Sequence, residues 1–69
     1  MADSTYKMVE LVGTSKKSYE EAIEHAVARA SKTLRSLDWF QVIELRGAVS
    51  KGKVTQYQAV LKIGFKLED

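Results

Sequence analysis

Residues 39–67, WFQVIELRGAVSKGKVTQYQAVLKIGFKL, decide the fold of this chain because they predict two long strands joined by a tight turn. The strands run from about Trp39 to Val49 and from about Val54 to Leu67, with apolar residues at alternate positions. Between them, Ser50-Lys51-Gly52-Lys53 suits a two-residue hairpin turn with a positive φ at the glycine. This hairpin places Trp39 opposite Gly64, Ile43 opposite Val60, and Leu45 opposite Gln58.

Successive side chains of a strand point to opposite sides, so the hairpin has two faces. The face expected to lie under a helix carries Phe40, Val42, Tyr57, Ala59, Leu61, Ile63, Phe65 and Leu67. The other face carries Trp39, Gln41, Ile43, Leu45, Gln58, Val60, Lys62 and Gly64.

The residues before the hairpin predict a strand from about Tyr6 to Val12, stopped by Gly13, and a helix from about Lys17 to Ser36. Ser18 and Glu21 form a capping box at the helix start, because the hydroxyl can accept from the Glu21 amide and the carboxylate can reach back. Apolar residues then recur at spacings of three and four along the helix: Tyr19, Ala22, Ile23, Ala26, Val27, Ala30, Leu34 and Leu37. The element order is β-α-β-β in an α+β domain.

The length of 69 residues allows one domain, residues 1–69, with a marginal core. With 0 Cys and 1 His, disulfides and a zinc site are excluded as sources of stability, which leaves oligomerisation. A helix of about 18 residues covers ~27 Å, whereas strands of 12 to 14 residues reach ~40 Å or more. We therefore expect copies of the chain to cover the rest of the hairpin.

A net charge of +2 is a weak argument for nucleic acid as a partner. The chain has no apolar signal-peptide core and no apolar run near the ~20 residues that span a bilayer. We expect a cytoplasmic protein without a membrane partner.

Trp39 and Gln58 fall on the same predicted face, where a flat ring and a side-chain amide suit a planar heteroaromatic ligand. Gly64, opposite Trp39, would leave an open slot above the sheet in which such a ligand could stack. The alternatives are a tryptophan of the core and a solvated strand glutamine.

Several charged residues admit two interpretations each. Arg46 is a surface charge or a fork for a phosphate, and Glu44 has no assigned role. His25 is expected to be solvated or ion-paired with Glu21. Gly13-Thr14-Ser15 is an anion-binding turn or part of the helix cap. The basic residues near the helix end compensate its dipole or, with Lys7 and Lys66, form a phosphate pocket.

Five short motifs together resemble the bacterial dodecins over essentially the whole chain. They are Val9-Glu10-Leu11-Val12-Gly13-Thr14-Ser15, Leu37-Asp38-Trp39-Phe40, Glu44-Leu45-Arg46-Gly47, Tyr57-Gln58 and Gly64-Phe65-Lys66-Leu67-Glu68. The resemblance implies a three-stranded antiparallel sheet partly wrapped around one helix and assembled as a hollow homo-dodecamer of cubic symmetry.

The resemblance also implies noncovalent flavin binding, with two flavins stacked between tryptophans of symmetry-related subunits. Trp39 matches the stacking residue, Gln58 matches the glutamine that hydrogen-bonds the isoalloxazine, and Asp38 lies beside them. Arg46 matches a position associated with the FMN phosphate, which favours FMN over riboflavin, and riboflavin and FAD are the alternative flavins.

Bacterial members also hold coenzyme A near their three-fold axes. On that similarity, the candidate contacts are Lys7, Arg29, Arg35 and Lys66. Relatives carry arginine at the position of Lys66, and lysine offers a point charge without a planar fork.

The leading hypothesis is a non-enzymatic flavin storage and sequestration protein, in which the indole quenches excited flavin and so protects against light. One alternative is a small flavin-dependent oxidoreductase, which would need access for a second substrate to the ring. Another is a β-α-β-β nucleic-acid-binding module, although the basic residues form no continuous stripe.

Overall fold

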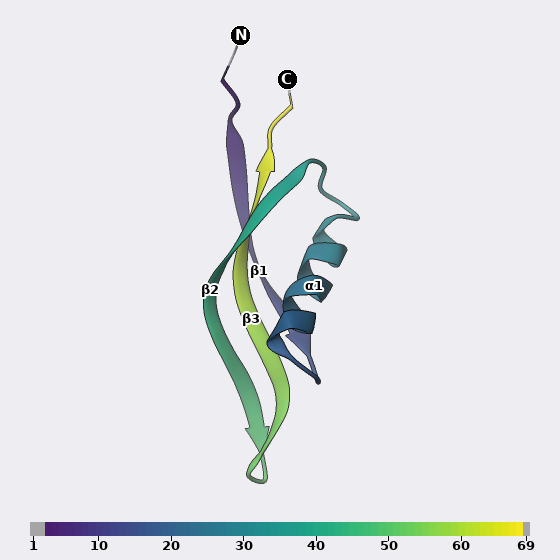
Figure 1. Cartoon of the computed structure of the whole chain (residues 1–69), viewed down its shortest axis with the longest axis vertical. Coiled ribbons are helices and arrows are strands. Elements are labelled where there is room, and N and C mark those ends of the chain that lie inside the picture. The colour runs from purple at the N-terminus through teal and green to yellow at the C-terminus, as the bar shows by residue number, and fades with distance from the viewer. Residues whose placement is uncertain (1–2, 69) are drawn as a thin grey trace.

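The computed structural model describes residues 3–68, which form one helix on one side of a three-stranded sheet (Figure 1). The elements are β1 (Tyr6–Ser15), α1 (Tyr19–Ala30), β2 (Leu37–Ser50) and β3 (Lys53–Lys66). The sheet order is β1-β3-β2, and both pairs are antiparallel. The predicted β-α-β-β order and antiparallel sheet are confirmed.

Strand β1 continues to Ser15, so the prediction that Gly13 stops it was wrong. Gly13 lies within the strand, paired with Ala59, and a Cβ there would overlap the Ala22 carbonyl oxygen and lie 2.8 Å from the Ala26 Cβ. The glycine is therefore a site of close helix approach, and the strand keeps its hydrogen bonds beneath the helix.

The helix is also shorter than predicted, since it ends at Ala30 and not at Ser36. Ser31 Oγ donates a hydrogen bond to the Ala28 carbonyl at 2.7 Å, and the Leu34 amide bonds the Ala30 carbonyl at 2.9 Å. Serine side chains that bond nearby carbonyls compete with helix propagation. Ser36, with a φ of 60°, then turns the chain into β2.

The capping box is half confirmed. Ser18 Oγ accepts from the Glu21 amide at 3.0 Å as predicted. The Glu21 carboxylate instead accepts from the Ser15 hydroxyl at 2.8 Å, and Ser15 Oγ in turn accepts from the amides of Lys17 and Ser18 at 2.9 and 3.3 Å. The Ser15 hydroxyl thus bridges the Glu21 carboxylate and the Ser18 amide, which the carboxylate was expected to bond directly.

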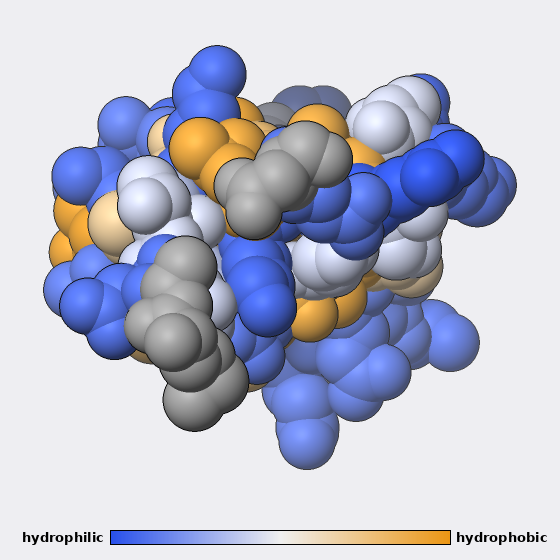
Figure 2. Space-filling model, turned by 90° about the horizontal axis from the view of Figure 1, so that it is seen from above, coloured by the Kyte–Doolittle hydropathy of each residue, from blue (hydrophilic) through white to orange (hydrophobic). Residues whose placement is uncertain are grey.

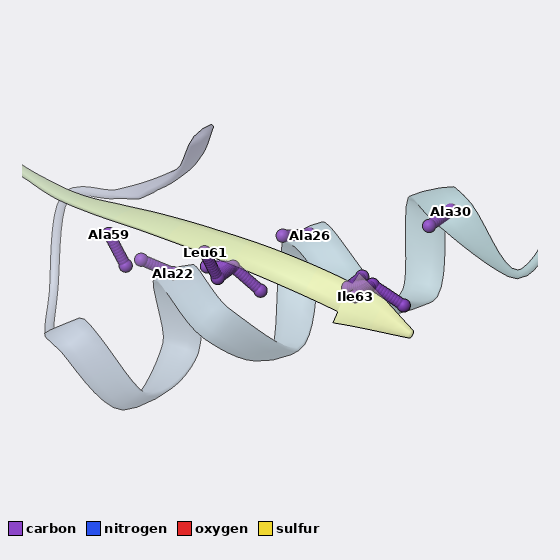
Figure 3. Packing of buried hydrophobic residues seen from close by; sticks show 6 residues of the cluster. All are labelled: Ala22, Ala26, Ala30, Ala59, Leu61 and Ile63. Atoms are coloured by element: carbon purple, nitrogen blue, oxygen red, sulfur yellow. The ribbon is translucent and has the colours of Figure 1, made fainter. Parts of the chain in front are cut away.

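The core lies between α1 and the centre of the sheet (Figure 3). Alanine side chains of the helix meet larger side chains of β3, and the buried cluster comprises Ala22, Ala26, Ala30, Ala59, Leu61 and Ile63. Because alanine is small, the helix backbone approaches the sheet closely. The three β3 residues in this cluster confirm the predicted helix-facing side of that strand.

Strand β2 is not covered by the helix. The helix packs on β1 and β3, and Phe40 and Val42 remain 49% and 39% exposed, although they pair with the buried Ile63 and Leu61. Both residues lie on the predicted helix-facing side, but the expected cover was wrong, because a single helix is too narrow to cover a third strand. The β2–β3 hairpin also extends well past the helix (Figure 1), in a molecule that measures 57 × 20 × 13 Å.

The register of the hairpin contains a bulge that alternation alone does not reveal. Trp39 pairs with Gly64 as predicted, but the register shifts between Val42 and Glu44, so that Glu44 pairs with Val60 and Arg46 with Gln58. The predicted pairs Ile43–Val60 and Leu45–Gln58 were wrong because the bulge at Ile43 adds one residue to β2. A second shift near the turn restores Ser50 opposite Lys53, and both Lys51 and Gly52 have positive φ, at 52° and 77°.

The close approach at Gly13 is testable by the change Gly13→Ala. The added methyl group would meet the Ala22 carbonyl oxygen, so we expect a loss of about 1–3 kcal/mol in the free energy of unfolding. Urea unfolding followed by circular dichroism measures it, with Lys16→Ala on the exposed loop as a control that should change stability by less than about 0.5 kcal/mol. Equal stability of the two variants would contradict this account of helix packing.

Candidate functional site

Trp39 lies at the start of β2 on the side of the sheet opposite α1. It pairs with Gly64, and a Cβ on that glycine would overlap the indole at Cε2 and Cζ2. The indole is 42% exposed and its ring centroid lies 5.0 Å from that of Tyr6, at an interplanar angle of 54°. The slot expected above Gly64 is therefore filled by the indole itself, which rests on the glycine, while Trp39 stays partly exposed.

A pocket of about 140 Å³ opens beside this tryptophan, between α1 and the start of β2. Asp38 is the extra residue of a bulge between Leu37 and Trp39, and it contributes the one acidic side chain of the lining. The remaining lining is apolar, from Val27, Leu37, Trp39, Phe40 and Ile63. The structure thus brings Asp38 and Trp39 together at a small apolar opening.

Gln58 belongs to a chain of hydrogen bonds further along the hairpin. Arg46 Nε donates to Gln58 Oε1 at 2.8 Å, and Gln58 Nε2 donates to Gln56 Oε1 at 2.7 Å. Arg46 Nη1 also lies 3.7 Å from a carboxylate oxygen of Glu44. The bulge at Ile43 accounts for this grouping, because it turns Glu44 and Arg46 to the face that carries Gln58.

The sequence interpretation missed two members of this chain. Gln56 was not assigned to the site, although its spacing of two from Gln58 places both glutamines on one face of β3. Glu44 had no explanation because the unbulged register turned it toward the helix. The bulge carries no sequence signal that we recognise.

Trp39 and Gln58 share a face, but one chain does not bring them together. Trp39 sits over Gly64, and Gln58 is six residues away on the same strand, a separation of about 20 Å at roughly 3.3 Å per residue. A three-ring heterocycle cannot contact both residues of a single copy. Any site that uses both must draw them from two chains.

The basic residues expected near coenzyme A do not share one surface. Lys7 pairs with Phe65 and Lys66 with Tyr6, so that the two side chains leave opposite faces of the sheet. Arg29 lines a groove beside β1 with Thr14 and His25, while Arg35 lies in the connection between α1 and β2.

The polar groups of the turn after β1 form hydrogen bonds with side chains of the turn and of α1. Ser15 is 6% exposed and bonds Glu21, and the His25 Nδ1 lies 2.9 Å from the Thr14 carbonyl oxygen, with Nε2 3.8 Å from a Glu21 carboxylate oxygen. The capping interpretation of this turn is confirmed, and His25 lies beside Glu21 with its side chain more than half exposed. Between residues 3 and 68, no helix is long and apolar enough to cross a membrane.

Comparison with known proteins shows the family and the fold of the chain. The sequence profile of the Dodecin family matches residues 5–68. The curated Dodecin of Thermus thermophilus is 58% identical over 64 residues, which are 93% of this chain and 93% of the relative. The chain belongs to the dodecin family.

Solved dodecin structures have the same architecture. The structure of dodecin from Streptomyces coelicolor superposes with a TM-score of 0.95 at 48% identity, covering 100% of this chain and 99% of that chain. A relative from Mycobacterium tuberculosis, named Calcium dodecin, is 40% identical over 65 residues, or 93% of this chain and 90% of the relative. In the described part of this dodecin, no group of three or more His, Cys, Asp or Glu side chains comes together.

The contact between the indole and Gly64 is testable by fluorescence, because Trp39 is the single tryptophan of the chain. In Gly64→Ala, the new methyl group displaces the ring toward solvent, so we expect the fluorescence emission maximum to shift to longer wavelength. Gly52→Asn is the matched control, because no atom lies within 4 Å of a Cβ there and asparagine tolerates positive φ. An unchanged spectrum in Gly64→Ala would contradict the contact.

Proposed function

We propose that this dodecin is a non-enzymatic flavin-binding protein that stores and sequesters FMN as a hollow homo-dodecamer. The observation that carries the proposal is the partly exposed Trp39, whose indole is held against Gly64. Membership of the dodecin family supports the same ligand class, and Gln58 with Arg46 supplies a polar group on the same face.

Assembly follows from the two ways in which the single chain is incomplete. The distance between Trp39 and Gln58 requires residues from two copies at each site. In addition, large apolar side chains on β2 lack a covering element, among them Phe40, Val42, Ile43 and Leu45. Figure 2 shows hydrophobic surface between hydrophilic side chains in the view from above. Uncovered apolar surface of this kind suits subunit contact.

Within the assembly, we propose that two flavins stack between the Trp39 rings of symmetry-related subunits, with Asp38 at the margin. Gln58 bonds the polar edge of the isoalloxazine. Arg46 gives the charge that favours FMN over riboflavin, since a guanidinium pairs strongly with phosphate; riboflavin and FAD are the alternative flavins.

Storage suits this arrangement better than turnover does. A pair of flavins enclosed between two indoles offers no free ring face to a second substrate, and a stacked electron-rich indole quenches the excited flavin. A small flavin-dependent oxidoreductase would instead oxidise NAD(P)H faster in the presence of the protein than with free FMN alone.

Coenzyme A is a second ligand that we propose from the family resemblance, at Lys7, Arg29, Arg35 and Lys66. Because Lys7 and Lys66 leave opposite faces of the sheet, these contacts would come from neighbouring subunits around a three-fold axis. The localisation that we propose for this assembly is the cytoplasm.

The stacking proposal predicts the effect of Trp39→Ala. Aromatic stacking is worth about 1–3 kcal/mol, so FMN should bind at least about fivefold more weakly. Equilibrium dialysis against FMN measures both affinities, because the variant lacks the indole that is expected to quench flavin fluorescence. The control Val54→Ala alters an exposed residue near the hairpin tip and should bind FMN as wild type does. Equal affinity of Trp39→Ala and wild type would refute the proposed site.

Size and colour together test the assembly. Gel filtration should show a particle of roughly twelve times the 7.8 kDa chain mass, with flavin absorbance in the same peak. The same column run with RNA discriminates the nucleic-acid-binding alternative. A colourless monomer that co-elutes with RNA in a salt-sensitive manner would favour that alternative and contradict storage.

A further inference from the structure

Gln56 is the last of three hydrogen-bonded side chains, after Arg46 and Gln58. The donor and acceptor at each step are fixed because a guanidinium can only donate. Arg46 Nε can only donate, so the Gln58 atom that lies 2.8 Å from it must be the amide oxygen. The amide nitrogen of Gln58 then faces Gln56, at 2.7 Å, and Gln56 must present its own oxygen. The guanidinium therefore dictates the orientation of two amides in succession.

The reversed orientation of Gln58 is unfavourable at both ends. It would place the NH₂ group against the guanidinium N–H and the oxygen against the Gln56 oxygen, so that both hydrogen bonds would be lost. Gln56 and Gln58 are half-buried, and an unmade hydrogen bond in a partly buried amide is costly. Glu44 lies 3.7 Å from Arg46 Nη1 and helps to hold the guanidinium in place.

With one bond at its oxygen and one at its nitrogen, Gln58 keeps one acceptor site and one N–H for a ligand. Their order along the face is fixed. A heterocycle edge that carries a matching donor and acceptor is recognised only if this order is maintained, because the flipped amide presents acceptor where donor is needed.

On the basis of the proposed flavin site, we propose that Gln56 is a positioning residue that sets the amide orientation of Gln58. Arg46 acts at the other end of the same chain, in addition to its proposed contact with phosphate. Gln56 works through Gln58 and needs no contact with the ligand itself.

The test uses riboflavin, which has the isoalloxazine ring without phosphate, and the assembled full-length protein. Gln56→Met keeps the side-chain length but removes the acceptor, and we expect riboflavin to bind roughly five- to tenfold more weakly. Gln56→Glu keeps an acceptor oxygen and should bind within about twofold of wild type. Thr55→Val is the matched control, because it removes the Thr55 hydrogen bond to the Ala48 carbonyl at the neighbouring position and should leave affinity unchanged.

A second variant separates the two actions of Arg46 and does not depend on the assembly of the Gln56 variants. If Arg46 orients Gln58, Arg46→Met weakens riboflavin by roughly five- to tenfold, as Gln56→Met does. If riboflavin binding is unchanged while FMN binding falls, Arg46 acts on phosphate alone. The hydrogen bonds from Arg46 through Gln58 to Gln56 then have no positioning role.

The outcomes distinguish this inference from the proposed function. Tight riboflavin binding by both wild type and Gln56→Met would overturn the role of Gln56 and leave flavin storage intact. Equal weakening in Gln56→Glu and Gln56→Met would also overturn it, because the acceptor would then be irrelevant. Failure of wild type to bind any flavin would overturn the proposed function and this inference together.

Discussion

The close approach of α1 to the sheet is the contact on which the rest of the structure depends. Ala22 and Ala26 face Gly13 on β1, where even one methyl group would collide with the helix. Small residues at this contact let a helix of 12 residues bury Leu61 and Ile63, but a helix so near and so short covers only β1 and β3. The exposed inner side of β2 is the direct consequence of this packing.

The bulges in β2 decide which side chains reach the outer face. The bulge at Asp38 precedes Trp39, and the bulge at Ile43 turns Glu44 and Arg46 to the side of Gln58. A bulge changes the side-chain phase of every residue that follows until another shift restores it. The grouping of Glu44, Arg46 and Gln58 therefore depends on an irregularity in the strand, whereas Trp39 keeps the register that the turn sets.

Sequence patterns predicted the fold well because alternation, helical spacing and the Lys51-Gly52 turn are local signals. The pair Trp39–Gly64 was predicted because the register between the turn and Trp39 contains shifts that cancel. The pair Arg46–Gln58 lies between those shifts and could not be read from alternation. The role of Gly13 was predicted wrongly, because the sequence alone does not distinguish a glycine that allows a helix to approach closely from a glycine that ends a strand. The short helix was missed because Leu34 continues the apolar spacing after Ala30.

The separation of Trp39 from Gln58 links ligand binding to assembly in the proposed function. If each site draws the indole and the amide from different chains, the ligand contacts the assembled form and not the isolated subunit. A ligand that binds only one state stabilises that state by mass action. Flavin then adds to the stability that a chain of 69 residues without cysteine cannot obtain from its own core.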